Sequence, residues 1–292
     1  MKRLLCVVLA MLLFFSGCST EIETGEPPVD FQIAASFYPV YITALNIAGD
    51  VDGVAVKSLV GAQAGCLHDY TLTVSEMKIA EQSDVLIING AGMEPFTDKI
   101  AESIPTLEII DASENIEKIS ADGQENPHVW LDVENAIIQA ETITDALCSL
   151  RPEYSGAFRA NLEKYQKKLE ELDEELKDML EPISGAKLIT FHEAFEYFAD
   201  AYGLEVAASI VRDENTAPSP KEIEDVISIM EENEIGAIFS EEQYKDSVID
   251  TVAQATDAQI YELDPVVTGE NSPDAYIDAM RKNAQTLLEA FE

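Results

Sequence analysis

The stretch EYSGAFRANLEKYQKKLEELDEELKDMLE (153–181) decides the fold predicted for this chain. Its apolar residues recur every three or four positions, which predicts one face of a single helix. They are Tyr154, Phe158, Leu162, Tyr165, Leu169, Leu172, Leu176 and Met179. Pro152 precedes the stretch and Pro182 ends it, and at about 1.5 Å per residue the helix is roughly 43 Å long. Such a helix predicts either a coiled-coil seam or a rigid connection within one chain.

Strands and helices alternate on both sides of this helix, which favours the rigid connection. Short apolar runs predict strands at 31–37, 54–60, 84–89, 106–112, 187–192, 204–210, 235–241 and 259–264. Helices are expected between them, for example at 39–48, 73–82, 132–148, 220–233 and 246–257, and from 273 onward. Continuously apolar strands such as 84–89 are typical of buried parallel sheets.

The predicted fold class is therefore α/β, with two βα lobes and parallel-type sheets. The first lobe spans 31–150, one long rigid linking helix spans 151–182, and the second lobe spans 183–292. Two lobes on either side of one helix predict a ligand site in the cleft between them, because open α/β sheets bind ligands at the carboxyl ends of their strands.

The first 17 residues predict a secretion signal. Two basic residues precede an unbroken apolar run at 4–15, which is shorter than the ~20 residues of a membrane-spanning helix. Ser16-Gly17-Cys18 resembles a lipoprotein processing box, with Phe15 where leucine is usual. Cys18 is thus predicted to carry the lipid, and the acidic segment 18–30 to be a disordered tether. The alternative is a plain cleaved signal with an incidental cysteine. Either way, the protein is expected outside the cytoplasm, and lipidation would anchor it to the membrane.

The net charge excludes some partners. The chain has 56 acidic and 18 basic residues, giving a net charge of −38 at pH 7. Such a surface repels nucleic acid and anionic lipid headgroups and attracts cations. No nucleic-acid partner is expected, and the charge supports a cation ligand only weakly because acidic surfaces are often merely solvated.

The chain has only three histidines, each in a compact motif. His68 lies in GCLHDYTLT (65–73), His128 in NPHVWLD (126–132) and His192 in LITFHEAFEYFADAYGL (188–204). Each alone would be read as a structural histidine with a hydrogen-bond partner. Together, two from the first lobe and one from the second, they predict one metal ion in the cleft. Imidazole suits zinc and similar first-row ions.

A fourth ligand is expected from the second lobe, where Glu193, Glu241, Glu242 and Asp264 are the candidates. Asp264 is favoured because it ends a strand and precedes Pro265, and Glu241 is the possible alternate ligand. Cys66 is near enough to His68 to be considered as a thiolate ligand, but is less favoured. A disulfide between Cys66 and Cys148 is not expected, because Cys148 lies about 24 Å along the helix that begins after Asp132.

These motifs resemble those of the zinc/manganese solute-binding lipoproteins of bacterial ABC importers. Their first metal block resembles HDYTLTVSEMKIAEQSDVLIINGAGME (68–94), and their second resembles NPHVWLD (126–132). The third block of zinc-type members is similar to FHEAFEYFADAYGL (191–204), and the acidic fourth position is similar to ELDP (262–265). The resemblance runs from about residue 31 to the C-terminus. Two departures are the missing His-rich insertion and Leu67, which stands where some members have glutamate.

The resemblance implies a non-enzymatic, monomeric binding protein that carries Zn²⁺, or alternatively Mn²⁺, to an ABC permease and its ATPase. The implied ligands are His68, His128, His192 and Asp264. A surface adhesin is a further alternative. A zinc hydrolase is disfavoured, because HExxH is absent after His192-Glu193 and Asp264 would fill the open coordination position. A serine hydrolase is disfavoured by the absence of G-x-S-x-G.

Overall fold

The computed structural model describes residues 29–61, 65–68, 70–121, 123–211, 217–241 and 247–292. The predicted signal segment, the lipidation site Cys18 and residues 18–28 of the tether lie outside the described residues. All eight predicted strands are present, each within two or three residues of its expected bounds. Within the described part of the chain, no helix is both long and apolar enough to cross a membrane.

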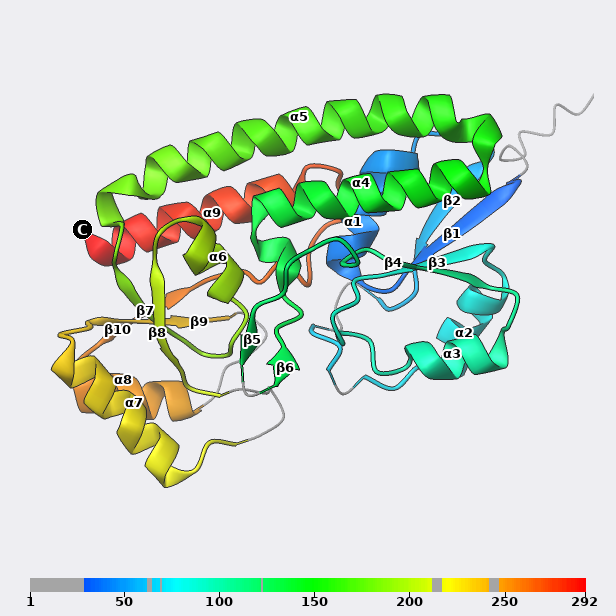
Figure 1. Cartoon of the computed structure of the whole chain (residues 1–292). Coiled ribbons are helices and arrows are strands. Elements are labelled where there is room, and N and C mark those ends of the chain that lie inside the picture. Colours follow the sequence, from blue (N-terminus) through cyan, green and yellow to red (C-terminus); the bar gives the residue numbers. More distant parts are fainter. Residues whose placement is uncertain (1–28, 62–64, 69, 122, 212–216, 242–246) are drawn as a thin grey trace, which may run out of the picture.

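Each lobe contains a four-stranded parallel sheet (Figure 1). In the first lobe the order is β2-β1-β3-β4, with β1 (Phe31–Ala35), β2 (Val54–Ser58), β3 (Val85–Ile88) and β4 (Glu108–Asp111). In the second lobe the order is β10-β9-β7-β8, with β7 (Lys187–Thr190), β8 (Glu205–Ser209), β9 (Ala237–Ser240) and β10 (Gln259–Glu262). Read from its other edge, the second order repeats the first. In each sheet, successive strands are added toward one edge and then toward the other. This change falls between β1 and β3 in the first lobe and between β7 and β9 in the second, and each such position is the switch point of its sheet.

Helices cover both faces of each sheet (Figure 1). Around the first sheet lie α1 (Tyr38–Ala48), α2 (Val74–Glu81), α3 (Thr97–Ser103) and α4 (Val133–Leu150). Around the second lie α6 (Glu196–Ala201), α7 (Pro220–Glu232), α8 (Ser247–Thr256) and α9 (Ala275–Phe291). This arrangement buries the apolar strands on both sides, as their continuous hydrophobicity predicts.

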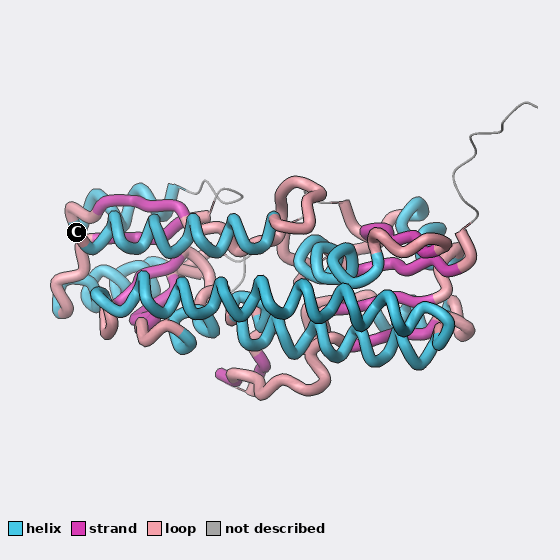
Figure 2. The backbone as a smooth tube through the Cα atoms, turned by 90° about the horizontal axis from the view of Figure 1, so that it is seen from above, coloured by secondary structure: helices cyan, strands magenta, loops and turns pink. Residues whose placement is uncertain are grey.

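The predicted linking helix is α5 (Ser155–Leu180), which runs along both lobes (Figures 1 and 2). Pro152 and Pro182 lie in short 3-10 turns at its two ends, η2 (Pro152–Tyr154) and η3 (Glu181–Ile183). Its apolar stripe packs on α1 and α4 of the first lobe and on α9 of the second. Phe158, Leu169, Leu172 and other stripe residues belong to one hydrophobic core that continues from the first lobe into the second. The two lobes are therefore joined by packing as well as by the chain.

One small element was not predicted. The connection between β4 and α4 contains a two-stranded antiparallel ribbon of β5 (Ser120–Ala121) and β6 (Gln124–Glu125). Strands of two residues are too short to carry an alternating pattern, so the sequence gives no signal for them.

Candidate metal centre

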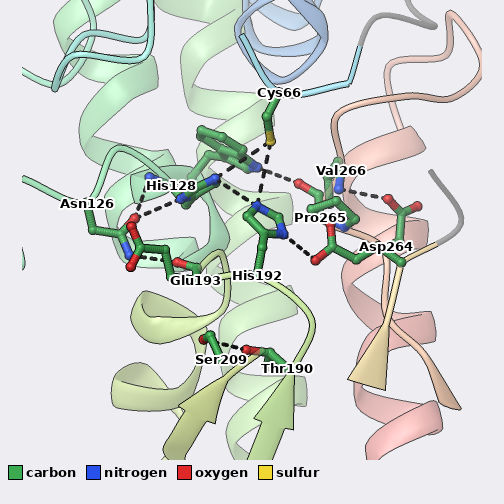
Figure 3. A network of polar contacts seen from close by, with 12 residues as sticks. Cys66, Asn126, His128, Thr190, His192, Glu193, Ser209, Asp264, Pro265 and Val266 are labelled. Atoms are coloured by element: carbon green, nitrogen blue, oxygen red, sulfur yellow. Dashed lines mark hydrogen bonds and ion pairs between the residues drawn. The ribbon is translucent and has the colours of Figure 1, made fainter. Parts of the chain in front are cut away.

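The candidate centre lies between the lobes, and secondary structure positions its residues from both sides (Figure 3). His128 precedes the 3-10 turn η1 (Val129–Leu131), after which Asp132 caps α4 by accepting a 2.8 Å hydrogen bond from Glu134 N. His192 follows β7, and Glu241 follows the neighbouring strand β9. These two residues therefore occupy the switch point of the second sheet, where α/β sheets bind ligands.

The predicted histidines do come together. The Nε2 atoms of His128 and His192 are 3.3 Å apart, and both side chains are fully buried. The ring of His68, in the loop after β2, lies 5.3 Å from that of His128, centroid to centroid. Cys66, His68 and His128 each offer a ligand atom within 4.8 Å of the others.

Both buried imidazoles are fixed by hydrogen bonds on their other nitrogen. His128 Nδ1 donates to Asn126 Oδ1 at 2.8 Å, and His192 Nδ1 donates to Glu241 Oε1 at 2.5 Å. Since an amide oxygen and a carboxylate can only accept, Nδ1 of each ring carries a proton, which in a neutral ring leaves the lone pair on Nε2. This is how metal-binding histidines are usually oriented by their outer contacts.

The electrostatics of His128 favour a neutral ligand. Burial lowers the pKa of His128 well below its usual value, and the neighbouring His192 and His68 lower it further. Its Nε2 lone pair therefore faces His192 Nε2 across 3.3 Å. Such an arrangement is stabilised by a cation, or by a proton shared between the rings.

Asn126 links the two lobes at this point. Its Nδ2 donates to Glu193 O at 2.8 Å and to Glu196 Oε2 at 3.0 Å, both in the second lobe. Its backbone carbonyl accepts from Tyr197 Oη at 2.9 Å. The same side chain thus orients a first-lobe imidazole and holds the start of α6. The only signal for this role in the sequence is that Asn126 stands two residues before His128.

The two predicted carboxylate candidates have other contacts. Asp264 Oδ1 accepts from Val266 N at 2.7 Å, and its backbone exchanges two hydrogen bonds with the Asn283 side chain of α9. Val266 has φ of 58°, a rare conformation for a β-branched residue, so this bond stabilises a demanding turn. Glu241 holds Nδ1 of His192, on the opposite side of the ring from Nε2. That Asp264 is the fourth ligand stays a prediction.

A buried carboxylate, Glu94, supports the centre from the switch point of the first sheet. Glu94 Oε1 accepts from Ser36 Oγ at 2.6 Å and Asn89 N at 2.7 Å, and Oε2 accepts from Gly90 N at 3.1 Å. Asn89 Nδ2 in turn donates to Pro127 O at 2.9 Å, next to His128. The sequence signal available for Glu94 was its position directly after a strand and a glycine-rich turn.

The titration of Glu94 is expected to make stability depend on pH. Burial raises its pKa to about 7, although the three hydrogen bonds oppose this. Because the folded pKa lies above the unfolded one, the stabilisation is full below about pH 4.5 and is lost as pH rises through 7. The expected loss is on the order of 3 kcal/mol in the free energy of unfolding.

The measurement is urea unfolding of the metal-free protein between pH 5 and 8, compared with Glu94→Gln. Asp132, whose pKa burial raises to about 6, changes stability in the same direction, and the comparison removes its contribution. Equal pH dependence in the two proteins would contradict the assignment.

Residues 33–290 match the family model described as zinc-uptake complex component A, periplasmic. The chain belongs to this family. It is 26% identical over 290 residues to the manganese-binding lipoprotein MntA of Halalkalibacterium halodurans, covering 97% of this chain and 96% of the relative. It is 29% identical to the metal ABC transporter substrate-binding lipoprotein ScbA of Streptococcus cristatus, covering 100% and 99%.

Solved structures agree with the fold. The binding protein FpvC of Pseudomonas aeruginosa, determined with Mn²⁺, superposes with a TM-score of 0.81 at 27% identity and covers 89% of this chain and 97% of its own. The resemblance inferred from the three histidine motifs is therefore confirmed at the level of family and fold. The family model is named for zinc uptake, whereas MntA and the FpvC complex are named for manganese, so family membership does not by itself select zinc.

Proposed function

We propose that this protein is an extracytoplasmic lipoprotein that captures Zn²⁺ and delivers it to the permease of an ABC importer and its partner ATPase. The observation that carries the proposal is the pair of buried imidazoles, with Nε2 atoms 3.3 Å apart and both Nδ1 atoms held by Asn126 and Glu241. His68 is the third nitrogen ligand. Membership in a family of zinc-uptake components supports the transport role.

Burial favours a carried ion over a catalytic one. His128 and His192 have no exposed surface. A hydrolytic zinc needs an open position reached by water and substrate. Two fully buried imidazoles instead suit an ion that is bound, protected and released. The protein is accordingly proposed to be a monomeric binding protein and not an enzyme.

Zinc is expected to bind at least tenfold more tightly than manganese. Zinc accepts tetrahedral nitrogen coordination, whereas manganese prefers oxygen-rich shells. In His192→Glu, the affinity for zinc should fall and the difference between the zinc and manganese affinities should become smaller. The reason is that a carboxylate replaces one imidazole and would stand beside Glu241. Competitive titration of the metal-free protein with both ions at neutral pH measures this. Equal or tighter manganese binding by the unmodified protein would refute the proposed zinc preference.

Lipid anchoring is expected to depend on Cys18. Replacing Cys18 with alanine removes the thiol that would carry the lipid, so the protein should move from the membrane to the soluble fraction. Detergent partitioning of cells expressing each form tests this. Cys148→Ala is the matched control and should stay with the membrane. If Cys18→Ala also stays there, the anchor lies elsewhere.

A further inference from the structure

The geometry points to the Cys66 thiolate as the fourth ligand of the ion, beside His68, His128 and His192. This inference rests on the proposed function, since it concerns the composition of the same site. It replaces the carboxylate predicted from the sequence with a sulfur from the first lobe. The ion would then be held by three ligands from that lobe and one, His192, from the second.

The distances match those of a tetrahedral zinc site. With Zn–N of about 2.0–2.1 Å and Zn–S of about 2.3 Å, tetrahedral angles place two nitrogen ligands about 3.3 Å apart and nitrogen and sulfur about 3.6 Å apart. The two Nε2 atoms are 3.3 Å apart. Cys66 Sγ is 3.6 Å from His128 Nε2 and 3.9 Å from His192 Nε2. The three atoms are thus spaced as three corners of one coordination tetrahedron.

The position of Cys66 also suits a ligand. Cys66 is 8% exposed, and in Figure 3 its sulfur points toward the imidazole rings of His128 and His192. Gly65 before it has φ of 73°, a left-handed conformation that glycine adopts readily. His68 follows two residues later in the same loop, so one short segment supplies two ligand atoms.

Asp264 is the competing candidate, and one of its two carboxylate oxygens already accepts a hydrogen bond. Its Oδ1 accepts from Val266 N, and ligation through that oxygen would compete with the turn it stabilises. A thiolate and a carboxylate contribute the same single negative charge. With three neutral imidazoles and Zn²⁺, either gives a net site charge of +1. Charge therefore does not separate the two candidates, and the inference rests on the distances of Cys66 Sγ from the two imidazoles.

Sulfur ligation has a chemical consequence for the cargo. On binding, the S–H bond breaks, a Zn–S bond forms and the proton passes to the solvent, because a thiol ligates as its thiolate. Thiolate favours zinc and other soft ions, whereas manganese prefers carboxylate and water. Cys66 is thus a determinant of metal selectivity, and its loss should weaken zinc binding far more than manganese binding.

The direct test is zinc-edge X-ray absorption of the full-length zinc-loaded protein. The expected result is one sulfur at about 2.3 Å together with nitrogen neighbours at about 2.0–2.1 Å. Cys66→Ser should lose the sulfur shell, whereas Cys148→Ser should keep it. Cys148 is the matched control because it is equally buried and its Sγ contacts Ser155 O on a distant helix end.

Affinity provides the second readout. Cys66→Ser is expected to weaken zinc binding by about 30-fold or more, as loss of a buried charged partner does. Cys148→Ser should leave it unchanged. A zinc shell of nitrogen and oxygen alone, with affinity lost in Asp264→Asn and retained in Cys66→Ser, would overturn the inference and leave zinc capture intact. A protein that binds no zinc would refute the proposed function itself.

Discussion

Replacing His128 with alanine is expected to lower the affinity for zinc by well over the ~10–100-fold that loss of an outer hydrogen-bond partner causes. His128 is the central member of the cluster, because its ring lies 5.3 Å from that of His68 and 5.0 Å from that of His192. Its removal takes away one of the proposed ligands and the ring that contacts both other histidines. Titration against a competing chelator measures the change.

The matched control for this substitution is Asn126→Ala. That variant keeps all the proposed ligands but removes the acceptor of the hydrogen bond from His128 Nδ1. Its affinity for zinc should therefore fall by about 10–100-fold. Circular dichroism of both variants verifies that the fold is retained. An affinity for zinc in His128→Ala that equals that of the unmodified protein would remove His128 from the centre.

Replacing Trp130 with alanine is expected to destabilise the metal-free protein by about 3–5 kcal/mol, the usual cost of truncating a buried aromatic residue. Trp130 is 1% exposed and packs edge-on against Phe37. Its Nε1 donates to Pro265 O at 2.8 Å, and its carbonyl accepts from Tyr276 Oη on α9 at 2.8 Å. The residue therefore connects the first lobe with the second through side chain and backbone.

Urea unfolding followed by circular dichroism measures this cost, since Trp130 is the only tryptophan and its fluorescence is lost in the variant. Trp130→Phe is the control. This variant keeps most of the packing but removes the hydrogen bond to Pro265 O. Its free energy of unfolding should therefore fall by ~1 kcal/mol, plus a small contribution from poorer packing. A change below 1 kcal/mol in Trp130→Ala would show that the lobes do not depend on this contact.

The sequence predicted the features that arise from local periodicity and composition. The stripe of α5 and the apolar runs of the eight strands are patterns within single segments, and the structure has all of them. The three histidines could be grouped because the chain has no others and each lies in a distinctive motif. The parallel arrangement followed from the alternation of strands and helices.

What the sequence did not predict depends on contacts between distant segments. Asp264 was favoured because Pro265 would hold it rigidly, and the turn is indeed well defined, but the bond to Val266 N occupies one carboxylate oxygen. Cys66 is a less favoured ligand from its place in the sequence, and only the folded loop brings its sulfur beside His128, 62 residues away in the chain. The supporting roles of Asn126 and Glu94 likewise appear only when the lobes are assembled.

The hydrogen bonds of Asn126 make metal affinity and lobe separation parts of one equilibrium. Moving the Glu193–Glu196 segment away from the first lobe breaks the bonds to Asn126 Nδ2 and so frees the amide that orients His128. A docking partner that stabilises the separated arrangement should therefore lower the affinity for the metal. By thermodynamic linkage, the bound metal lowers the affinity for that partner by the same factor. The free energy of docking is then coupled to release of the ion.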